Sequence, residues 1–158
     1  METVTEEFVY LKRITAANLF PVLALSETLS ADQRKMVADN SVSLAQAYCS
    51  ENAWVRAVYM NEDPIGFIMM HYGGEIEEGI LCPGAFLWRF MIAAPYQGKG
   101  YGRTALNLVI QQLKAQGYHE LYTSAGQGEG SPLEFYKRLG FVPTGDMLED
   151  EVELVLKW

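Results

Sequence analysis

Hydrophobic residues gather in seven short stretches of the chain, several of them alternating with polar residues, and this pattern predicts β-strands. The turn sequence 61–64 separates the second stretch from the third and predicts an antiparallel hairpin. The fourth stretch is apolar except for one charge, Arg89, and this composition favours a central place in the sheet. Pro95 ends it, because proline has no N–H for a strand ladder. The predicted strands are 8–14, 54–59, 65–72, 85–92, 118–124, 141–144 and 152–157.

The clearest helix in the sequence follows residue 102. Leu106, Val109, Ile110 and Leu113 recur at helical spacing along one face, and Gly117 supplies a C-terminal stop. A strand, a glycine-rich loop and this helix therefore follow one another directly along the chain.

Weaker signals predict helices in the first third of the chain. One covers 18–27, where Pro21 is tolerated only in the first turn. Another begins at Ser30, whose hydroxyl can accept from the orphan N–H groups of a helix start. A third covers 41–50. All three lie before the predicted hairpin.

A last helix begins at Ser131-Pro132-Leu133-Glu134, which matches a capping box with proline at the first helical position, and it ends at residues 139–140. The order of elements is then strands first, followed by strand, loop, helix, strand, helix and strand. That order predicts an α/β fold with a mixed sheet.

The length of 158 residues fits one domain covering residues 1–158. Apolar residues make up 49% of the chain, enough for a core. No apolar run approaches the roughly 18 residues that a membrane-spanning helix needs. The acidic start, residues 1–7, lacks the basic and apolar regions of a secretory signal. We therefore expect a cytoplasmic protein that does not enter a membrane.

Net charge and cysteine content limit the partners and the metal or disulfide chemistry that we expect. The net charge of −8 disfavours nucleic acid as a partner and suits a cationic substrate such as an amine. Cys49 and Cys82 stand far apart without a CxxC spacing. We therefore expect neither a disulfide framework nor a metal site.

The most informative segment is the glycine-rich loop 97–103, Gln-Gly-Lys-Gly-Tyr-Gly-Arg. Its three alternating glycines permit a tight turn that brings several N–H groups to one side. The following helix adds its unpaired N–H groups and positive dipole end, so the segment suits a pyrophosphate. A Walker A loop is excluded because Gly100 follows Lys99, and the dinucleotide pattern Gly-x-Gly-x-x-Gly does not fit. The alternative is a tight turn that binds no ligand.

The motif Gln97-x-x-Gly100-x-Gly102 resembles the signature Gln/Arg-x-x-Gly-x-Gly/Ala of the GNAT acetyltransferase superfamily. The segment 135–141, Phe-Tyr-Lys-Arg-Leu-Gly-Phe, is similar to a later motif of the same superfamily. Within it, the run 87–92 and the sequence as a whole look most like the spermine/spermidine acetyltransferase group. The resemblance implies a mixed, mostly antiparallel central sheet flanked by helices.

The resemblance further implies acetyl-CoA as co-substrate. The pantetheine arm would pair with the backbone of Phe90, Met91 and Ile92 as an added strand. An amine would then attack the thioester directly through a tetrahedral intermediate, with an N–H near Met91 or Ile92 stabilising the oxyanion. The pyrophosphate would be held by the glycine-rich loop, whose residues implied in cofactor binding are Gln97, Gly98, Lys99, Gly100, Tyr101, Gly102 and Arg103.

Tyr136 matches the position of the superfamily's general acid, which protonates the departing thiolate. The alternative for Tyr136 is core packing, because it shares a helix with Leu133 and Leu139.

The general base is less well defined by the resemblance. Trp88 stands where related polyamine acetyltransferases can carry a carboxylate, and it cannot accept a proton. The missing carboxylate would be replaced as the base by Glu75, Glu77 or Glu78 acting through water, or by bulk solvent. The alternative for the three glutamates is a solvated acidic loop.

A second departure concerns an asparagine that helps to hold the cofactor in this family. Glu129 occupies its position here. Ser131 could contribute instead, although capping a helix is the simpler account of this serine.

A polyamine is the first acceptor that the resemblance suggests, and a homodimer is the assembly that it suggests. Acetylation of an amino sugar, an amino acid or a protein N-terminus is the enzymatic alternative. A non-catalytic acyl-CoA sensor is the alternative from a different class of protein. Four aromatic residues could line an amine pocket or belong to the core, namely Tyr48, Trp54, Tyr72 and Trp88.

Overall fold

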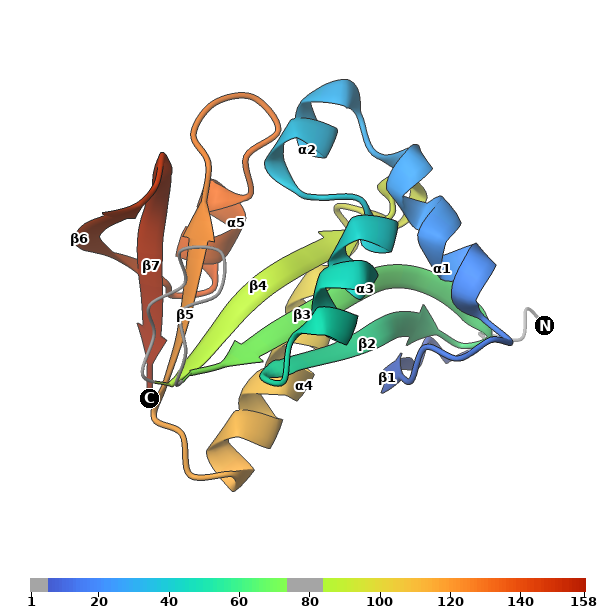
Figure 1. Ribbon diagram of the computed structural model, residues 1–158, viewed down its shortest axis with the longest axis horizontal. Helices are drawn as coiled ribbons and strands as arrows, with labels where there is room; N and C mark the ends of the chain where they lie inside the picture. Colours follow the sequence, from blue (N-terminus) through green and yellow to red (C-terminus); the bar gives the residue numbers. More distant parts are fainter. Residues whose placement is uncertain (1–5, 74–83) are drawn as a thin grey trace.

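The computed structural model describes residues 6–73 and 84–158, and within these ranges the chain forms one seven-stranded sheet (Figure 1). The strand order is β1-β2-β3-β4-β5-β7-β6. Neighbours run antiparallel except β4 and β5, which are parallel. This confirms the predicted mixed, mostly antiparallel α/β fold. The strands are β1 (Val9–Lys12), β2 (Ala53–Met60), β3 (Asp63–Tyr72), β4 (Ala85–Ile92), β5 (Glu120–Ala125), β6 (Val142–Leu148) and β7 (Glu151–Lys157).

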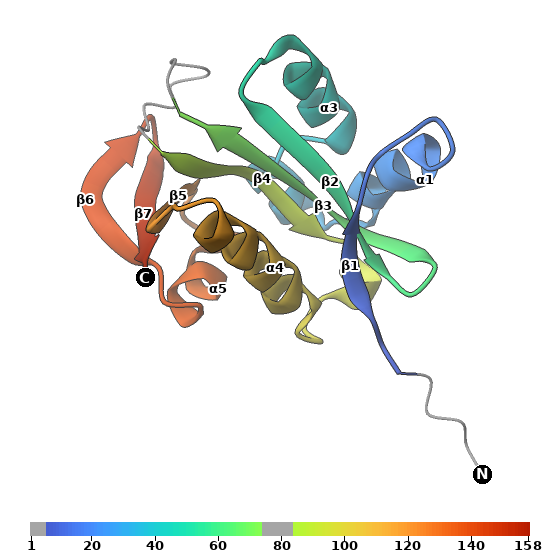
Figure 2. The ribbon, with the colours of Figure 1, turned by 90° about the horizontal axis from the view of Figure 1, so that it is seen from below.

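Helices cover both faces of the sheet (Figure 2). One face carries α1 (Leu19–Ala24), α2 (Ala31–Met36) and α3 (Asn40–Cys49), and the opposite face carries α4 (Tyr101–Ala115) and α5 (Leu133–Arg138). Short 3₁₀ turns, η1 (Leu25–Thr28) and η2 (Ala94–Tyr96), follow α1 and β4. The sheet therefore lies between two layers of helices.

Alternation along the central strands builds a separate core under each helical layer. On β3, Phe67 and Met69 belong to the cluster under α1–α3, whereas Ile68 and Met70 belong to the cluster under α4. The predicted apolar face of α4 is buried completely or nearly so: Leu106, Val109, Ile110 and Leu113. The helical periodicity of the sequence is thereby confirmed.

Local signals in the first half of the chain are confirmed in detail. The β2–β3 hairpin is antiparallel, and Pro21 lies in the first turn of α1. Ser30 caps α2 by accepting from the Gln33 N–H, and the Gln33 side chain accepts from the Ser30 N–H. No helix in the described part of the chain is long and apolar enough to cross a membrane.

Two predictions in the second half are wrong. Pro132 is the N-cap of α5, not its first helical residue, and Ser131 Oγ accepts from the N–H of Leu133 while its hydroxyl donates to the Gly126 carbonyl. The predicted capping box is therefore absent. The strand predicted to stop at residue 144 continues to Leu148, because Gly145 adopts a φ of 95° inside a register shift of β6 instead of ending the strand.

Candidate active site

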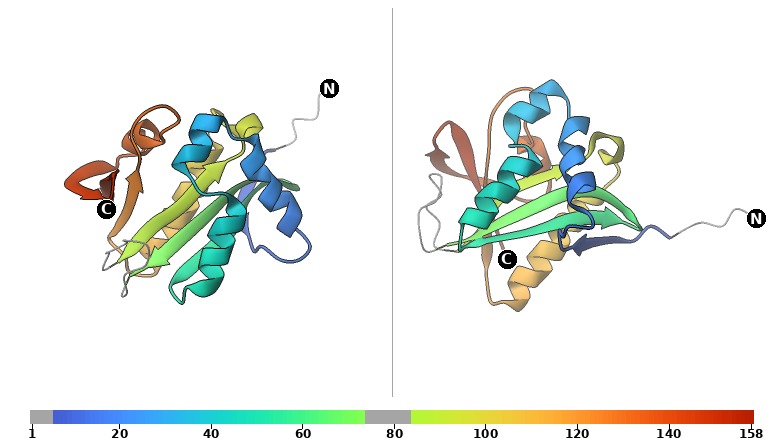
Figure 3. Two further views of the ribbon diagram at one scale, coloured as in Figure 1. Left: turned by 45° about the horizontal axis from the view of Figure 1, so that its top comes forward. Right: turned by 45° about the vertical axis from the view of Figure 1, so that its right-hand side comes forward.

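Strands β4 and β5 separate partway along their length and leave an open cavity of about 820 Å³. They pair only at Ala85–Leu121, Phe86–Tyr122 and Leu87–Thr123. Beyond this point they diverge (Figures 1 and 3), so among the described strands none pairs with residues 88–92 of β4 on the side that faces β5. At the last paired position, the Thr123 hydroxyl donates to the Leu87 carbonyl at 3.0 Å and joins the two strands where the opening begins.

A β-bulge in β4 coincides with the divergence. Met69 of β3 pairs with Arg89 and Met70 pairs with Leu87, so Trp88 is the extra residue. A bulge bends its strand and increases the local twist, which turns β4 away from β5. It also shifts the phase of the strand, so Phe90 faces the α4–α5 side, where its ring lies 6.1 Å from that of Phe135.

The backbone of β4 presents alternate residues to the opening. The Ala93 N–H donates to the Ile65 carbonyl on β3 at 2.8 Å, and Met91 pairs with Phe67 two positions earlier. Because bonded residues alternate along an antiparallel ladder, Met91 directs its polar backbone groups to β3, and Phe90 and Ile92 direct theirs to the opening. The Met91 side chain is also buried, with its sulfur 3.8 Å from Asn40 Nδ2.

The glycine-rich loop forms the wall between β4 and α4. Gly98 and Gly100 have φ values of 73° and 86°, in the left-handed region that favours glycine. A Cβ atom at either position would meet nothing within 4 Å, so the backbone conformation and not crowding selects glycine. Gly100 is the N-cap of α4 without a side-chain cap. The first N–H groups of α4 therefore lack helical acceptors at the edge of the cavity.

Other predicted loop residues have structural side chains. Gln97 Nε2 donates to the Ile92 carbonyl at 2.8 Å, and Gln97 Oε1 accepts from Gln33 Nε2 at 2.9 Å, which ties the loop to β4 and α2. The Tyr101 side chain is buried in the core near Tyr96. Lys99 is exposed and does not line the cavity, whereas Arg103 lines it and donates to the Arg138 carbonyl at 3.5 Å.

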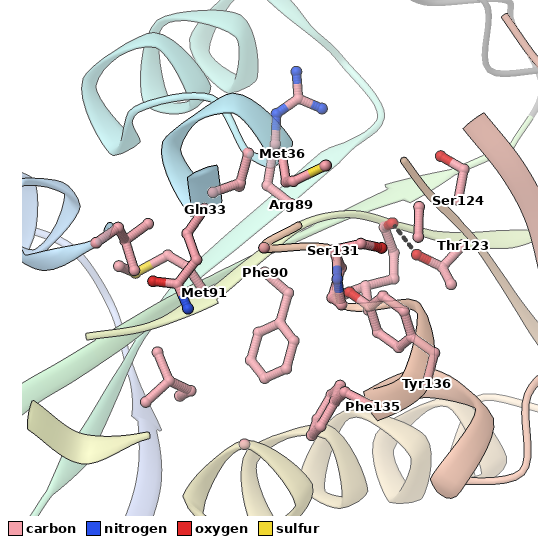
Figure 4. Close-up of a pocket in the computed structure, with 18 of the residues that line it drawn as sticks. Gln33, Met36, Arg89, Phe90, Met91, Thr123, Ser124, Ser131, Phe135 and Tyr136 are labelled. Atoms are coloured by element: carbon pink, nitrogen blue, oxygen red, sulfur yellow. Dashed lines mark hydrogen bonds between the residues drawn. The ribbon is translucent and has the colours of Figure 1, made fainter. Parts of the chain in front are cut away.

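Tyr136 lies in the core and also lines the cavity, so the two alternatives for this residue are compatible (Figure 4). Its side chain is 4% exposed and packs against Phe135 and Phe141. Burial raises the pKa of Tyr136 well above the ordinary 10.0, and the negative charge of Glu151 acts in the same direction, whereas a hydrogen bond with Thr123 acts against them. The phenol therefore keeps its proton at neutral pH.

The turn between β6 and β7 supplies carboxylates that the sequence pattern did not identify. Glu149, Asp150 and Glu151 line the cavity, and Ser124 on β5 donates its hydroxyl to Glu151 at 2.7 Å. The sequence signal was a run of three acidic residues, which is typical of an exposed turn.

Several other candidates fall elsewhere. Glu75, Glu77 and Glu78, the glutamates that could act as the base, lie outside the described residues, as does Cys82. Ser131 lines the cavity and Glu129 does not. Of the four candidate aromatic residues, Trp88 lines the cavity. Trp54 and Tyr72 pack against the core, which was the alternative for them. Tyr48 is 92% exposed, so for this residue both alternatives are wrong.

Comparisons with known proteins agree with this geometry. Residues 22–141 match the Acetyltransferase (GNAT) family. The chain is 29% identical over 139 residues to the spermine/spermidine N(1)-acetyltransferase of Bacillus subtilis (strain 168), covering 87% of this chain and 90% of the relative. Its fold is similar to that of the PaiA N-acetyltransferase of Thermoplasma acidophilum solved with coenzyme A, with a TM-score of 0.69, 16% identity and coverage of 96% and 99%. A GNAT acetyltransferase of Elizabethkingia anophelis with acetyl-CoA bound gives a TM-score of 0.67, 15% identity and coverage of 98% and 99%.

Proposed function

Because the chain belongs to the Acetyltransferase (GNAT) family, it is an acetyl-CoA-dependent N-acetyltransferase, and we propose that its acceptor is a small cationic primary amine, with polyamines first. The name of the Bacillus subtilis relative supports a polyamine. The acidic turn 149–151 in the cavity and the net charge of −8 support a cation of some kind. An amino sugar, an amino acid or a protein N-terminus is the enzymatic alternative.

The observation that carries the proposal is the unpaired edge of β4 beside the glycine-rich loop, with Tyr136 in the same cavity. The pantetheine arm pairs with the backbone groups of Phe90 and the N–H of Ile92 on the open side, whereas the Ile92 carbonyl accepts from Gln97. Met91 contributes through its place in β3–β4 pairing. An added strand of this kind satisfies backbone groups that water alone would otherwise solvate.

The pyrophosphate binds the N–H groups of residues 98–103. The glycine φ values curve this backbone, and the dipole of the 15-residue helix α4 adds positive potential at its N-terminus. Arg103 and Arg138 both line this part of the cavity, and among the described residues neither forms an ion pair, so both guanidinium groups can approach a phosphate. Gln97 and Tyr101 act indirectly, by fixing the loop.

In the reaction, the amine nitrogen attacks the thioester carbonyl to give a tetrahedral intermediate. An N–H on the open side of β4, at Phe90 or Ile92, stabilises the oxyanion. When the carbon–sulfur bond breaks, Tyr136 gives its proton to the departing thiolate. Burial raises the pKa of Tyr136, so the phenol carries its proton at neutral pH before the reaction begins.

The test is release of free CoA thiol from acetyl-CoA with spermidine, spermine, putrescine, an amino sugar and a lysine peptide. We expect release with the polyamines. Release only with the sugar or the peptide refutes the polyamine assignment. Thermal stabilisation by acetyl-CoA without release across the panel refutes the proposed acceptor and favours another acceptor or a cofactor sensor instead.

A further inference from the structure

The opening between β4 and β5 connects the two faces of the sheet. The side chains of β5 point alternately to these two faces. Leu121 belongs to the core under α4, and Tyr122 packs on the core under α1–α3. Continuing this alternation, Thr123 faces the α4–α5 side with Tyr136, and Ser124 faces the α1–α3 side. Figure 4 shows the same division, with Gln33 and Arg89 on one side of the cavity and Phe135 and Tyr136 on the other.

The cofactor elements of the proposed function lie at the α4–α5 side, because the glycine-rich loop leads into α4. An acceptor that meets the thioester within the opening must then enter from the α1–α3 side. Glu151 stands at this entrance, where it holds the Ser124 hydroxyl on that same side at 2.7 Å.

We infer that Glu151 binds the ammonium group of the acceptor and accepts its proton before attack. This inference rests on the proposed function and names the base that the proposed function leaves open. Glu151 is half-buried, whereas Glu149 and Asp150 on the same turn are exposed. A half-buried carboxylate interacts more strongly with a bound cation than an exposed one, because less water screens the pair.

The position of Glu151 fits this role in two further ways. Glu151 and Tyr136 line the same cavity, and the negative charge of Glu151 contributes to the raised pKa of Tyr136. Ser124 donates to Oε2, and no residue in the described ranges 6–73 and 84–158 donates to Oε1, which can therefore accept from the ammonium. The hydroxyl thereby orients the carboxylate without occupying it.

Each proton in the reaction has a donor and an acceptor. An alkylamine has a pKa of about 10.4 and arrives protonated, so it gives one proton to Glu151 and becomes nucleophilic. The nitrogen–carbon bond then forms, the carbon–sulfur bond breaks, and the thiolate takes the proton of Tyr136. The nitrogen releases its second proton to restore the Tyr136 phenol, and Glu151 returns its proton to solvent. The products are the acetamide, the CoA thiol and one proton.

The test compares Glu151→Gln with Glu153→Gln, a half-buried glutamate on the same strand that does not line the cavity. Both substitutions remove one negative charge from β7. Their side-chain amide oxygens can still accept from Ser124 and Thr144, respectively, so the local structure is preserved. Each variant is assayed for thiol release with the amine that the wild type accepts best and with its β-fluorinated analogue. The analogue has the same length, and its fluorine atoms lower the pKa of the amine, so more of it is already neutral at the assay pH and its reaction depends less on a base.

We expect Glu151→Gln to lower kcat about 10²-fold or more with the ordinary amine and to recover most of that loss with the fluorinated analogue. The Kd for acetyl-CoA and the melting temperature should stay at wild-type values, and Glu153→Gln should change kcat by less than about threefold. Equal losses with both amines, no loss, or a matching loss in a control variant overturns the inference. Absence of turnover by the wild type with every amine instead refutes the proposed function.

Discussion

Gly100 and Gly117 stand at the two ends of α4 and provide a matched pair for testing the pyrophosphate site. Their φ values are 86° and 89°, and an added Cβ would meet nothing within 4 Å at either position. Alanine therefore costs only the backbone strain of the left-handed region at both sites, about 1–2 kcal/mol. For a chain of this length, that strain lowers Tm by about 2–8 °C.

The two positions differ in what surrounds them. Gly100 lines the cavity and Gly117 does not. The methyl group of Gly100→Ala would stand in the space proposed for the pyrophosphate. We therefore expect the Kd for acetyl-CoA to be at least tenfold higher in Gly100→Ala than in Gly117→Ala, a loss of about 1.4 kcal/mol in binding free energy. Gly100→Glu, which adds bulk and negative charge, should abolish binding.

Calorimetric unfolding of the free proteins measures the strain, and calorimetric titration with acetyl-CoA measures the affinity. A pyrophosphate site at Gly100 requires equal losses of Tm in the two variants together with a larger loss of acetyl-CoA affinity in Gly100→Ala. If Gly100→Ala binds acetyl-CoA as tightly as Gly117→Ala, the loop does not hold the pyrophosphate. If Gly100→Ala alone loses Tm, the left-handed strain is not the common cost.

Three further outcomes follow from the site. Tyr136→Phe should lower kcat about 10²-fold with little change in acetyl-CoA affinity, because only the phenolic proton is lost; unchanged kcat would leave Tyr136 with a packing role alone. Because the pKa of Tyr136 is raised on folding, the folded protein holds a proton above pH 10.0 that the unfolded chain releases, so the free energy of unfolding is intact below pH 10.0 and falls above it. Urea unfolding should show a smaller alkaline loss of this free energy for Tyr136→Phe than for the wild type, and equal losses would contradict the raised pKa. Gln97→Leu removes the hydrogen bonds to Ile92 and Gln33, so titration should show about threefold to thirtyfold weaker acetyl-CoA binding, whereas wild-type affinity would mean that the loop is fixed without them.

Features specified by neighbouring residues were predictable from the sequence. The buried face of α4 follows from four residues at helical spacing, and the cap at Ser30 follows from residues within one turn. The glycine-rich loop was predictable for the same reason, since its φ values are imposed by consecutive residues.

Features that depend on strand register were not predictable in this way. Glu151 meets Ser124 across 27 residues of sequence, and only the pairing of β5 with β7 brings them together. The bulge at Trp88 depends on the pairing of β4 with β3, so the sequence pattern alone does not distinguish Phe90, Met91 and Ile92. The bend at Gly145 was missed because a glycine that stops a strand and one that bends it are the same letter in a sequence.

The unpaired edge of β4 also bears on self-association. Exposed strand edges recruit other chains and seed aggregates, and proteins commonly shorten, bend or interrupt the strands at the outside of a sheet. Here β1 has only four residues, and β6 carries Pro143 and the irregularity at Gly145. The edge best suited to accept another strand is instead enclosed between β4 and β5 within the sheet, where a slender extended molecule can reach it and a second copy of a folded sheet cannot.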